Sequence, residues 1–232
     1  MTIAPMVSVI MPVFNGEAYL AEAIQSVLGQ TWQNLELILV NDGSTDSSLG
    51  IAQGFRSATG KVQCISQENT GVSAARNRGI AASRGGLVAF LDQDDRWEPQ
   101  ALEIQVGVHQ QQPEILYTLG QQVCFLDDME EPPAWFRLQQ LDVPHTGYLP
   151  GTLVVKHQLF EQIGVFDTQY PISSDADWFA RARDAKVPVK ILPHTLLQRR
   201  IHPGNQSRHS QQIQGELTQL LLASIRRKRD KQ

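Results

Sequence analysis

The sequence has few of the features that mark membrane-spanning or disulfide-rich proteins. No segment approaches the roughly eighteen consecutive apolar residues that a membrane span needs. Only two cysteines occur, Cys64 and Cys124, both in apolar, strand-like surroundings, which indicates buried thiols in a reducing compartment. The N-terminus lacks the basic segment that opens a signal peptide. We therefore expect a cytoplasmic location.

Positive charge is scarce outside one end of the chain. The formal net charge is −4, and residues 226–231 carry five positive charges and one negative charge, so the remainder sums to −8. An acidic body argues against nucleic acid as the main partner. The chain has 232 residues, enough for one sizeable core, and it shows no internal repeat or low-complexity linker. A single domain is expected.

The chain is organised around residues 87–97, where an apolar run leads directly into acids. Residues 87–91 are uniformly apolar, as in a short strand buried on both faces. Asp92, Asp94 and Asp95 follow within four positions, and we expect them to emerge together at the carboxyl end of this strand. Clustered anions need a compensating cation, and oxygen ligands suit Mg²⁺ or Mn²⁺. The alternative is a solvated acidic turn, but three acids in this position favour the metal site.

Strand and helix patterns alternate through the first half of the chain. Strands are predicted at residues 7–13, 35–40 and 61–65. Helices are predicted at residues 17–30, from a cap at residues 44–46 to about residue 57, and at residues 72–83. This alternation predicts an α/β fold with a mostly parallel sheet, in which ligands bind beyond the carboxyl ends of the strands. Residues 12–16, Asp42 and residues 92–95 should therefore share one rim. Pro12 cannot donate to a ladder, so its strand should end there or lie at an edge.

The second half is less regular. Strands are predicted at residues 115–125 and 187–192, and a helix at 175–185 capped by Ser173 or Ser174. A polar turn is predicted at residues 199–205, before a final helix.

An ordered series of these segments resembles the family 2 nucleotide-sugar glycosyltransferases, which have the GT-A fold. The matching segments are residues 9–15, 40–46, 69–71 with 75–79, 90–95, 164–167, 175–178 and 200–205. The resemblance implies a Rossmann-like, mostly parallel sheet flanked by helices, with a smaller mixed acceptor-side region. It divides the single domain into a nucleotide-sugar-binding half (about 1–112), an acceptor and catalytic half (about 113–206), and a C-terminal helix with a basic tail (207–232).

The resemblance also implies residues that bind the nucleotide. Pro12, Val13 and Phe14 should line the pocket of the base, and Asp42 should accept a hydrogen bond from it. Arg76 should lie near the nucleotide, where its cation would serve the base or the phosphates.

The same resemblance places Asp92 at the ribose or nucleotide and Asp94 at a metal ion, Mn²⁺ or Mg²⁺. His202 stands where many relatives have a metal or diphosphate ligand. A divalent cation would neutralise the negative charge that develops on a diphosphate leaving group.

A carboxylate must remove the proton of the acceptor hydroxyl as that hydroxyl attacks. The family pattern has Glu-Asp, and here the pair is Ser174-Asp175, so the Glu is missing. Asp175 is our choice for the base and Asp177 is the competitor. Two positions further along a helix, Asp177 should point to a different face, so both cannot serve.

The implied reaction is inverting, metal-assisted transfer of a sugar from a nucleoside-diphosphate sugar, with UDP as the expected nucleotide, to a hydroxyl acceptor. Synthesis of polysaccharide, glycolipid or cell-envelope glycan would use such a step. One alternative is a sugar nucleotidyltransferase, which is disfavoured because the turn at residues 14–17 is acidic and poor in glycine. The other is a non-catalytic nucleotide-sugar-binding protein, for which the absent Glu leaves room.

The C-terminal helix presents one further pattern. Leu217, Leu220, Leu221 and Ile225 recur at helical spacing, and the basic run from Arg226 follows directly. This pattern predicts weak peripheral contact with an anionic membrane. The resemblance is consistent with such contact, because many acceptors of these transferases are lipid-linked. The alternative is that the leucines dock on the protein body and the basic tail is solvated.

Overall fold

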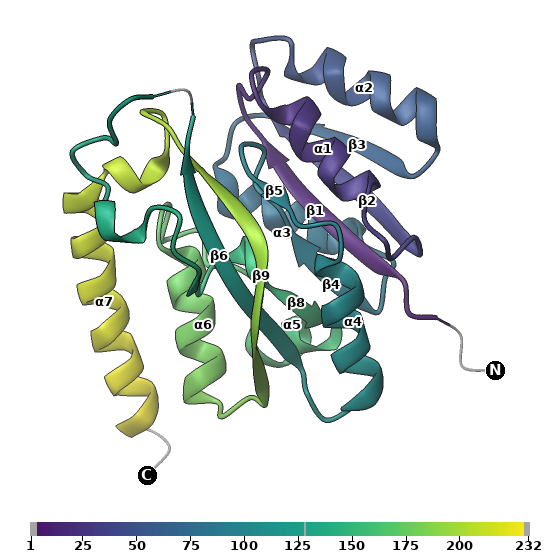
Figure 1. Cartoon of the computed structure of the whole chain (residues 1–232). Coiled ribbons are helices and arrows are strands. Elements are labelled where there is room, and N and C mark those ends of the chain that lie inside the picture. Colours follow the sequence, from purple (N-terminus) through teal and green to yellow (C-terminus); the bar gives the residue numbers. More distant parts are fainter. Residues whose placement is uncertain (1–3, 128, 230–232) are drawn as a thin grey trace.

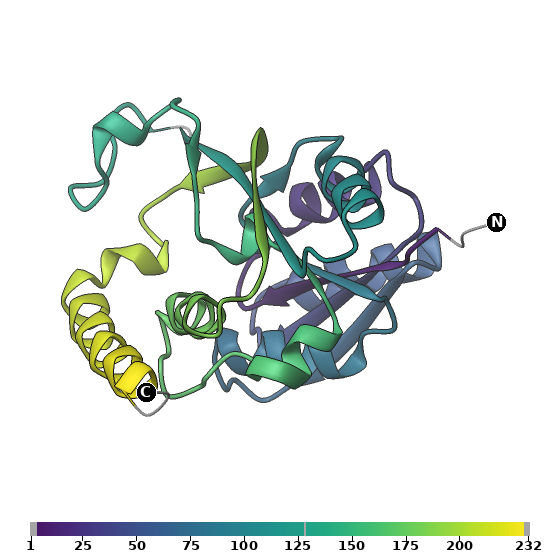
Figure 2. The same cartoon turned by 90° about the horizontal axis from the view of Figure 1, so that it is seen from below.

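A nine-stranded mixed sheet with helices on both faces forms the protein, as described by a computed structural model over residues 4–127 and 129–229 (Figures 1 and 2). The strands are β1 (Val7–Val13), β2 (Leu35–Asp42), β3 (Val62–Gln67), β4 (Leu87–Phe90), β5 (Arg96–Trp97), β6 (Tyr117–Leu126), β7 (His145–Thr146), β8 (Val154–Lys156) and β9 (Val189–Ile201). The helices are α1 (Leu20–Leu28), α2 (Ser48–Thr59), α3 (Val72–Ala82), α4 (Ala101–Gln111), α5 (Gln158–Ile163), α6 (Ser174–Asp184) and α7 (Ser210–Arg229). Three short 3₁₀ turns are η1 (Leu138–Gln140), η2 (Pro150–Thr152) and η3 (Gln206–Arg208).

The strand order is β3-β2-β1-β4-β8-β6-β9-β5, with β7 paired to β6. Strands β1 to β4 are parallel, β8 is antiparallel to β4 and β6, and β9 is parallel to β6. The predicted α/β fold with a smaller mixed region is therefore confirmed.

Side chains of the central strands alternate between two cores. On β1, Val9 and Met11 pack with α1 and α4 on one face, whereas Ile10 packs on the other face with α3, α5 and α6. On β4, Ala89 joins the first core and Phe90 the second. Because side chains of a strand alternate between faces, a strand covered on both sides reads as an unbroken apolar run.

Three local predictions can be compared with the structure, and the first agrees with it. Strand β1 ends at Val13, one residue after Pro12, and its pairing with β4 stops at Ile10, so the chain around Pro12 is bonded to β2 alone, as at a sheet edge. Strand β9 runs to Ile201 and includes part of the predicted polar turn. Ser173 takes the position before α6, yet its hydroxyl makes no capping hydrogen bond.

Two further expectations concern the cysteines and the absence of a membrane-spanning segment. Cys64 and Cys124 are free, with Cys124 buried and Cys64 partly exposed. Within residues 4–127 and 129–229, no helix is both long enough and apolar enough to cross a membrane.

A buried carboxylate joins the start of the sheet to the turn before β4. Glu36 accepts hydrogen bonds from Ser8 Oγ (2.6 Å), from the Arg84 backbone N–H (2.9 Å) and from the Arg84 guanidinium (2.6 Å). Burial alone would raise the pKa of Glu36, but these donors outweigh it and the pKa is lowered. A lowered pKa means that the folded state favours the ionised form.

We expect Glu36→Gln to lower the free energy of unfolding by about 1 to 3 kcal/mol at pH 7, because it leaves buried donors poorly paired. The difference between the two proteins should shrink as the pH falls from the ordinary glutamate range through the depressed folded-state pKa, since wild-type Glu36 is then protonated too. Urea unfolding at several pH values measures this, with the exposed Glu161→Gln as control. A difference that is constant with pH would contradict the assignment.

Candidate active site

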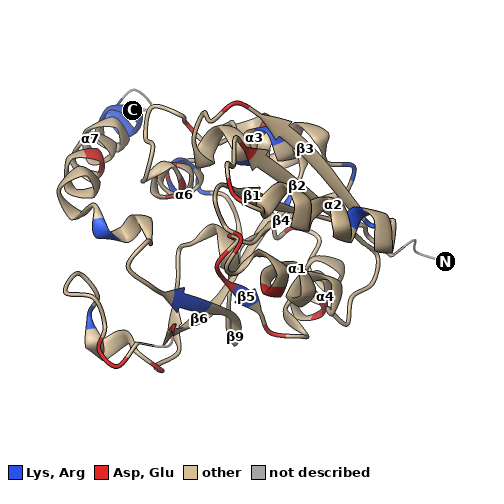
Figure 3. Ribbon diagram, turned by 90° about the horizontal axis from the view of Figure 1, so that it is seen from above, with Lys and Arg blue, Asp and Glu red and all other residues tan. Residues whose placement is uncertain are grey.

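The carboxyl ends of β1, β2 and β4 meet at one edge of the sheet, where a cavity of about 620 Å³ opens. Acidic residues gather at this edge, close to β4 and β5 (Figure 3). Ten of the eleven residues singled out from the sequence line this cavity: Pro12, Val13, Phe14, Asp42, Arg76, Asp92, Asp94, Asp95, Asp175 and His202. The eleventh, Asp177, is not among the residues that line it.

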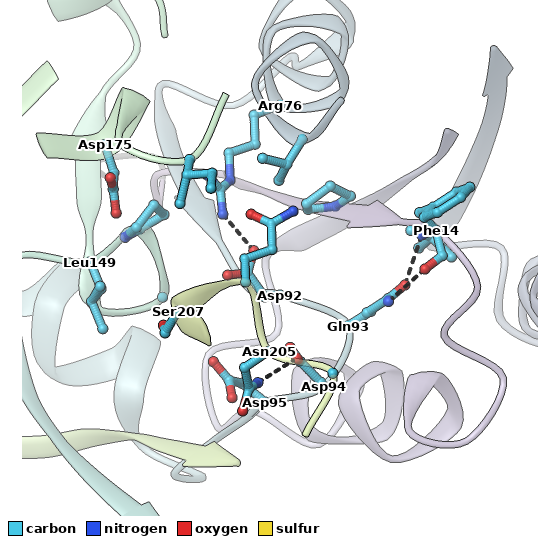
Figure 4. A pocket seen from close by; sticks show the side chains of 18 of the residues that line it. Phe14, Arg76, Asp92, Gln93, Asp94, Asp95, Leu149, Asp175, Asn205 and Ser207 are labelled. Atoms are coloured by element: carbon cyan, nitrogen blue, oxygen red, sulfur yellow. Dashed lines mark hydrogen bonds and ion pairs between the residues drawn. The ribbon is translucent and has the colours of Figure 1, made fainter. Parts of the chain in front are cut away.

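Phe14 is held at one end of the cavity by Gln93, a residue that the sequence did not single out. The Phe14 N–H donates to Gln93 Oε1 (2.8 Å), and Gln93 Nε2 donates to the Phe14 carbonyl (2.9 Å) (Figure 4). A Cβ on Gly16 would overlap the Gln93 amide, so this clamp requires glycine at position 16. The pairing links the loop after β1 to the acidic loop after β4.

Asp42 closes the neighbouring part of the cavity at the end of β2. Its carboxylate accepts the backbone N–H groups of Thr70 (2.9 Å) and Gly71 (2.8 Å), and the side-chain amide of Gln67 (2.8 Å). Oδ1 receives most of these bonds, while Oδ2 receives the one from Gly71. Asp42 thereby fixes the entry to α3 and retains a lone pair on Oδ2 for a ligand.

Arg76 and Asp92 form an ion pair in the middle of the cavity. The Arg76 guanidinium donates to Asp92 Oδ1 at 2.7 Å, and it lies over the ring of Phe166 at 5.7 Å. Arg76 is nearly buried, and its Nε has no hydrogen-bond partner among the described residues. A cation fixed at the wall of the cavity is suited to an anionic ligand.

Asp94 contacts His202 and Asn205 in the wall of the cavity. Asp94 Oδ2 lies 3.0 Å from His202 Nε2 and accepts from Asn205 Nδ2 at 3.2 Å. Asn205 Oδ1 in turn accepts the His202 backbone N–H (2.7 Å), which fixes the turn between β9 and η3. Asn205 belongs to the segment that carried the resemblance, and its position there is the only signal that could have found it.

The oxygen and imidazole donors of Asp94 and His202 fit a divalent cation. No group of three or more His, Cys, Asp and Glu residues within residues 4–127 and 129–229 could hold a metal ion by itself. Mg²⁺ is commonly bound by only one or two carboxylates together with substrate phosphates and water. The two donors therefore suit a cation that arrives with a phosphorylated ligand.

Arg200 of β9 holds the acidic loop from behind. Its backbone N–H donates to Asp95 Oδ1 (2.8 Å), its Nε donates to the Asp94 carbonyl (3.0 Å), and its guanidinium pairs with Asp127 (2.6 Å) and Glu22. Burial raises the pKa of Asp95 well above its ordinary value, and the charge of Asp94 adds to this effect. Removing negative charge from this loop should therefore change the free energy of unfolding little.

The two candidates for a base separate clearly. Asp175 is partly exposed and lines the cavity from the first turn of α6. Burial raises the pKa of its carboxyl, while the nearby charge of Arg76 opposes the rise. Asp177 is only 3% exposed and is bonded to Arg181 Nε at 2.7 Å. Of the two, only Asp175 offers its carboxylate to a ligand in the cavity.

A match to a protein family covers most of these residues. The chain matches the family described as Glycosyl transferase family 2 over residues 8–172. It is 32% identical over 214 residues to an uncharacterized glycosyltransferase of Rickettsia typhi, a match covering 87% of this chain and 65% of that protein. It is 42% identical over 103 residues to glycosyltransferase GlyA of Streptococcus pneumoniae, covering 44% of this chain and 15% of that protein.

The fold is similar to that of S. aureus TarS. The structure of TarS residues 1–349 with UDP-GlcNAc aligns with a TM-score of 0.71 at 19% identity, covering 88% of this chain and 61% of that one. The complex with UDP gives 0.69 at 20% identity, covering 85% and 61%. Our chain spans less than two thirds of the length of these relatives. Since the family match extends over more than half of the sequence, the chain belongs to glycosyl transferase family 2.

Proposed function

We propose that this chain carries the catalytic site of an inverting glycosyltransferase that moves a sugar from a UDP-sugar to a hydroxyl acceptor. The observation that carries the proposal is the order of residues along one cavity. Phe14 lies at one end, Asp175 at the other, and the Arg76–Asp92 pair between them (Figure 4). The nucleobase, the ribose with its diphosphate, and the sugar follow one another in the same order in a nucleoside-diphosphate sugar.

The end of the cavity near Phe14 supports a UDP-sugar as the first donor to test. Phe14 is 45% exposed and offers its ring to a base, with Pro12 and Val13 beside it and Asp42 as an acceptor. Arg76 and Asp92 are placed for the ribose or the phosphates. TarS, with a similar fold, has been solved with UDP and with UDP-GlcNAc.

Asp94 and His202 would hold Mn²⁺ or Mg²⁺ together with the diphosphate. Such a cation neutralises the charge of the leaving group without proton transfer. Asn205 orients the Asp94 carboxylate, and Arg200 fixes the loop that carries it.

Asp175 would accept the proton of the acceptor hydroxyl. Its raised pKa makes its carboxylate a stronger base than an exposed aspartate, which favours this role. A hydroxyl held by Asp175 would approach the sugar from the side opposite to the diphosphate, and such an attack inverts the anomeric centre.

The turn after β1 argues against a nucleotidyltransferase. The backbone N–H groups of residues 15, 16 and 17 donate to the side chains of Ser44 (3.1 Å), Ser48 (2.8 Å) and Asp46 (3.0 Å). A phosphate-binding loop needs such N–H groups free to bind the phosphates. The accessible carboxylate of Asp175 likewise favours an enzyme over a non-catalytic binding protein.

The exposed apolar residues of α7 support an acceptor at a membrane surface, in glycolipid, polysaccharide or cell-envelope glycan synthesis. Leu220 is buried (4% exposed), but Leu221 and Ile225 are 61% and 55% exposed, so the predicted stripe is divided between body and solvent. Arg226 and Arg229 follow on the last turn, and Arg227 and Lys228 instead pair with Asp184. The remainder of the basic run, residues 230–231, lies outside the described residues.

We expect Asp94→Ala to abolish cation-dependent donor binding and to leave the apo protein folded. The substitution removes one member of a like-charged cluster, so the free energy of unfolding should stay the same or rise. Calorimetric titration with UDP, with and without Mn²⁺, measures the binding, and urea unfolding measures the stability. The exposed Glu161→Ala is the control, and UDP and Mn²⁺ binding equal to wild type in Asp94→Ala would refute the metal assignment.

Asp175→Asn should keep the affinity for UDP and lose transfer by roughly 10²- to 10⁴-fold, the usual contribution of a general base. Asp177→Asn should mainly lower stability, because it weakens the buried pair with Arg181. Release of UDP from UDP-sugars in the presence of acceptor, corrected for the folded fraction, measures the rates. A small loss in Asp175→Asn with a large loss in Asp177→Asn would move the role to Asp177.

On liposomes, we expect weak binding to anionic vesicles that disappears with added salt. Each Lys or Arg near an anionic surface contributes on the order of 1 kcal/mol, so Arg226 and Arg229 give only a modest attraction. Replacing Leu221 and Ile225 by Ser should abolish sedimentation with the vesicles, while Gln219→Ser on the same helix should not. Equal recovery in the supernatant with neutral and anionic vesicles at low salt would end the proposal.

A further inference from the structure

Helix α7 lies side by side with α6, the helix that carries Asp175 (Figures 1, 2 and 3). Its buried residues are Glu216, Leu220 and Ser224, which recur every four positions and so share one face. A buried helix face usually consists of apolar residues, but here a carboxylate and a hydroxyl lie on either side of the one leucine. We propose that Glu216 positions Asp175 for catalysis, an inference that rests on the function proposed above.

Glu216 is bonded to the turn that leads into α6. Its Oε2 accepts the backbone N–H of Ser173 at 2.7 Å and that of Ile172 at 3.3 Å, and its Oε1 accepts from Gln212 Nε2 at 3.0 Å. Glu216 is only 7% exposed. Backbone N–H groups at a helix start lack acceptors within the helix, and negative charge is favourable there. A carboxylate from a different helix therefore accepts the N–H groups of the two residues that lead into α6, and its negative charge lies at the start of that helix.

The turn held by Glu216 is the wall of the cavity beside the proposed base. Ile172 and Asp175 both line the cavity, and Ser174 between them accepts a hydrogen bond from Ser73 of α3 at 2.8 Å. Residues 172–175 are thus fixed from α7 on one side and from α3 on the other. At position 174, where the family pattern has Glu, this chain has Ser, and the carboxylate next to the turn belongs to Glu216.

The far end of α6 is fixed to α7 by separate contacts. Asp184 accepts from Ser224 Oγ (2.9 Å) and from Arg227 Nε (3.0 Å), and it pairs with Lys228 (3.4 Å). Arg227 also lies 3.9 Å from Asp177 in the first turn of α6, whereas Ser224 bonds to Asp184 alone. Ser224 therefore provides a control in which helix docking is weakened and the turn beside Asp175 is left intact.

A base acts only when its carboxylate lies within hydrogen-bond reach of the hydroxyl, and a misplacement of about 1 Å can cost on the order of 10²-fold in rate. Loosening the turn should therefore lower kcat and leave donor binding unchanged, because the nucleotide end of the cavity is built from β1, β2 and β4. We expect Glu216→Ala to lower kcat by roughly ten- to a hundredfold with unchanged KM for the donor and unchanged affinity for UDP. Glu216→Gln keeps an oxygen that can accept the same two bonds, so it should recover most of the rate.

The control is Ser224→Ala, which removes a bond to Asp184 at the far end of α6 and should lower the melting temperature while leaving kcat per folded enzyme as in wild type. Hydrogen exchange gives a readout that does not depend on transfer: Glu216→Ala should speed exchange at residues 172–176, and Ser224→Ala should not. If wild type binds UDP but transfers no sugar, the proposed function fails, whereas the exchange result still tests the link between α7 and this turn. Unchanged kcat and unchanged exchange in Glu216→Ala, or equal losses of kcat in the Ala and Gln variants, would overturn the positioning role.

Discussion

Balancing negative charge at the carboxyl ends of β1, β2 and β4 is the constraint on which the site depends. Asp92, Asp94 and Asp95 lie within a stretch of four residues just after β4, and each has its own partner from elsewhere in the chain. Arg76 of α3 pairs with Asp92, His202 faces Asp94, and the Arg200 backbone N–H donates to Asp95. The contacts of Arg200 and His202 with this acidic loop also connect the end of β9 in the second half to the first half.

The same need for partners explains why α6 and α7 lie together. Helix α6 presents Asp175 to the cavity, keeps Asp177 in a buried pair with Arg181, and ends at Asp184. Helix α7 supplies an acceptor at the start of α6 and donors at its end, through Glu216 and Arg227. The exposed leucines Leu217 and Leu221 of α7 line a second cavity beside α6, and Ile225 is exposed further along the helix.

Features that depend on local pattern were predictable, and features that depend on distant partners were not. The apolar run at residues 87–91 indicated a strand covered on both faces, and the acids after it indicated a site at the strand end. Gln93 and Glu216 gave no signal, because their backbone partners lie 79 and 43 positions away. Arg200 favoured a turn because it is charged, yet it lies in a strand, where Asp127 and Glu22 balance it.

The most direct test of the account is a crystal structure with UDP and Mn²⁺. We expect uracil beside Phe14 and Asp42, the ribose near Asp92, and the diphosphate within reach of Asp94 and His202, so that the β-phosphate end of the nucleotide points toward Asp175. A nucleotide bound in the opposite direction along the cavity, or outside it, would contradict the assignment of every residue in the site.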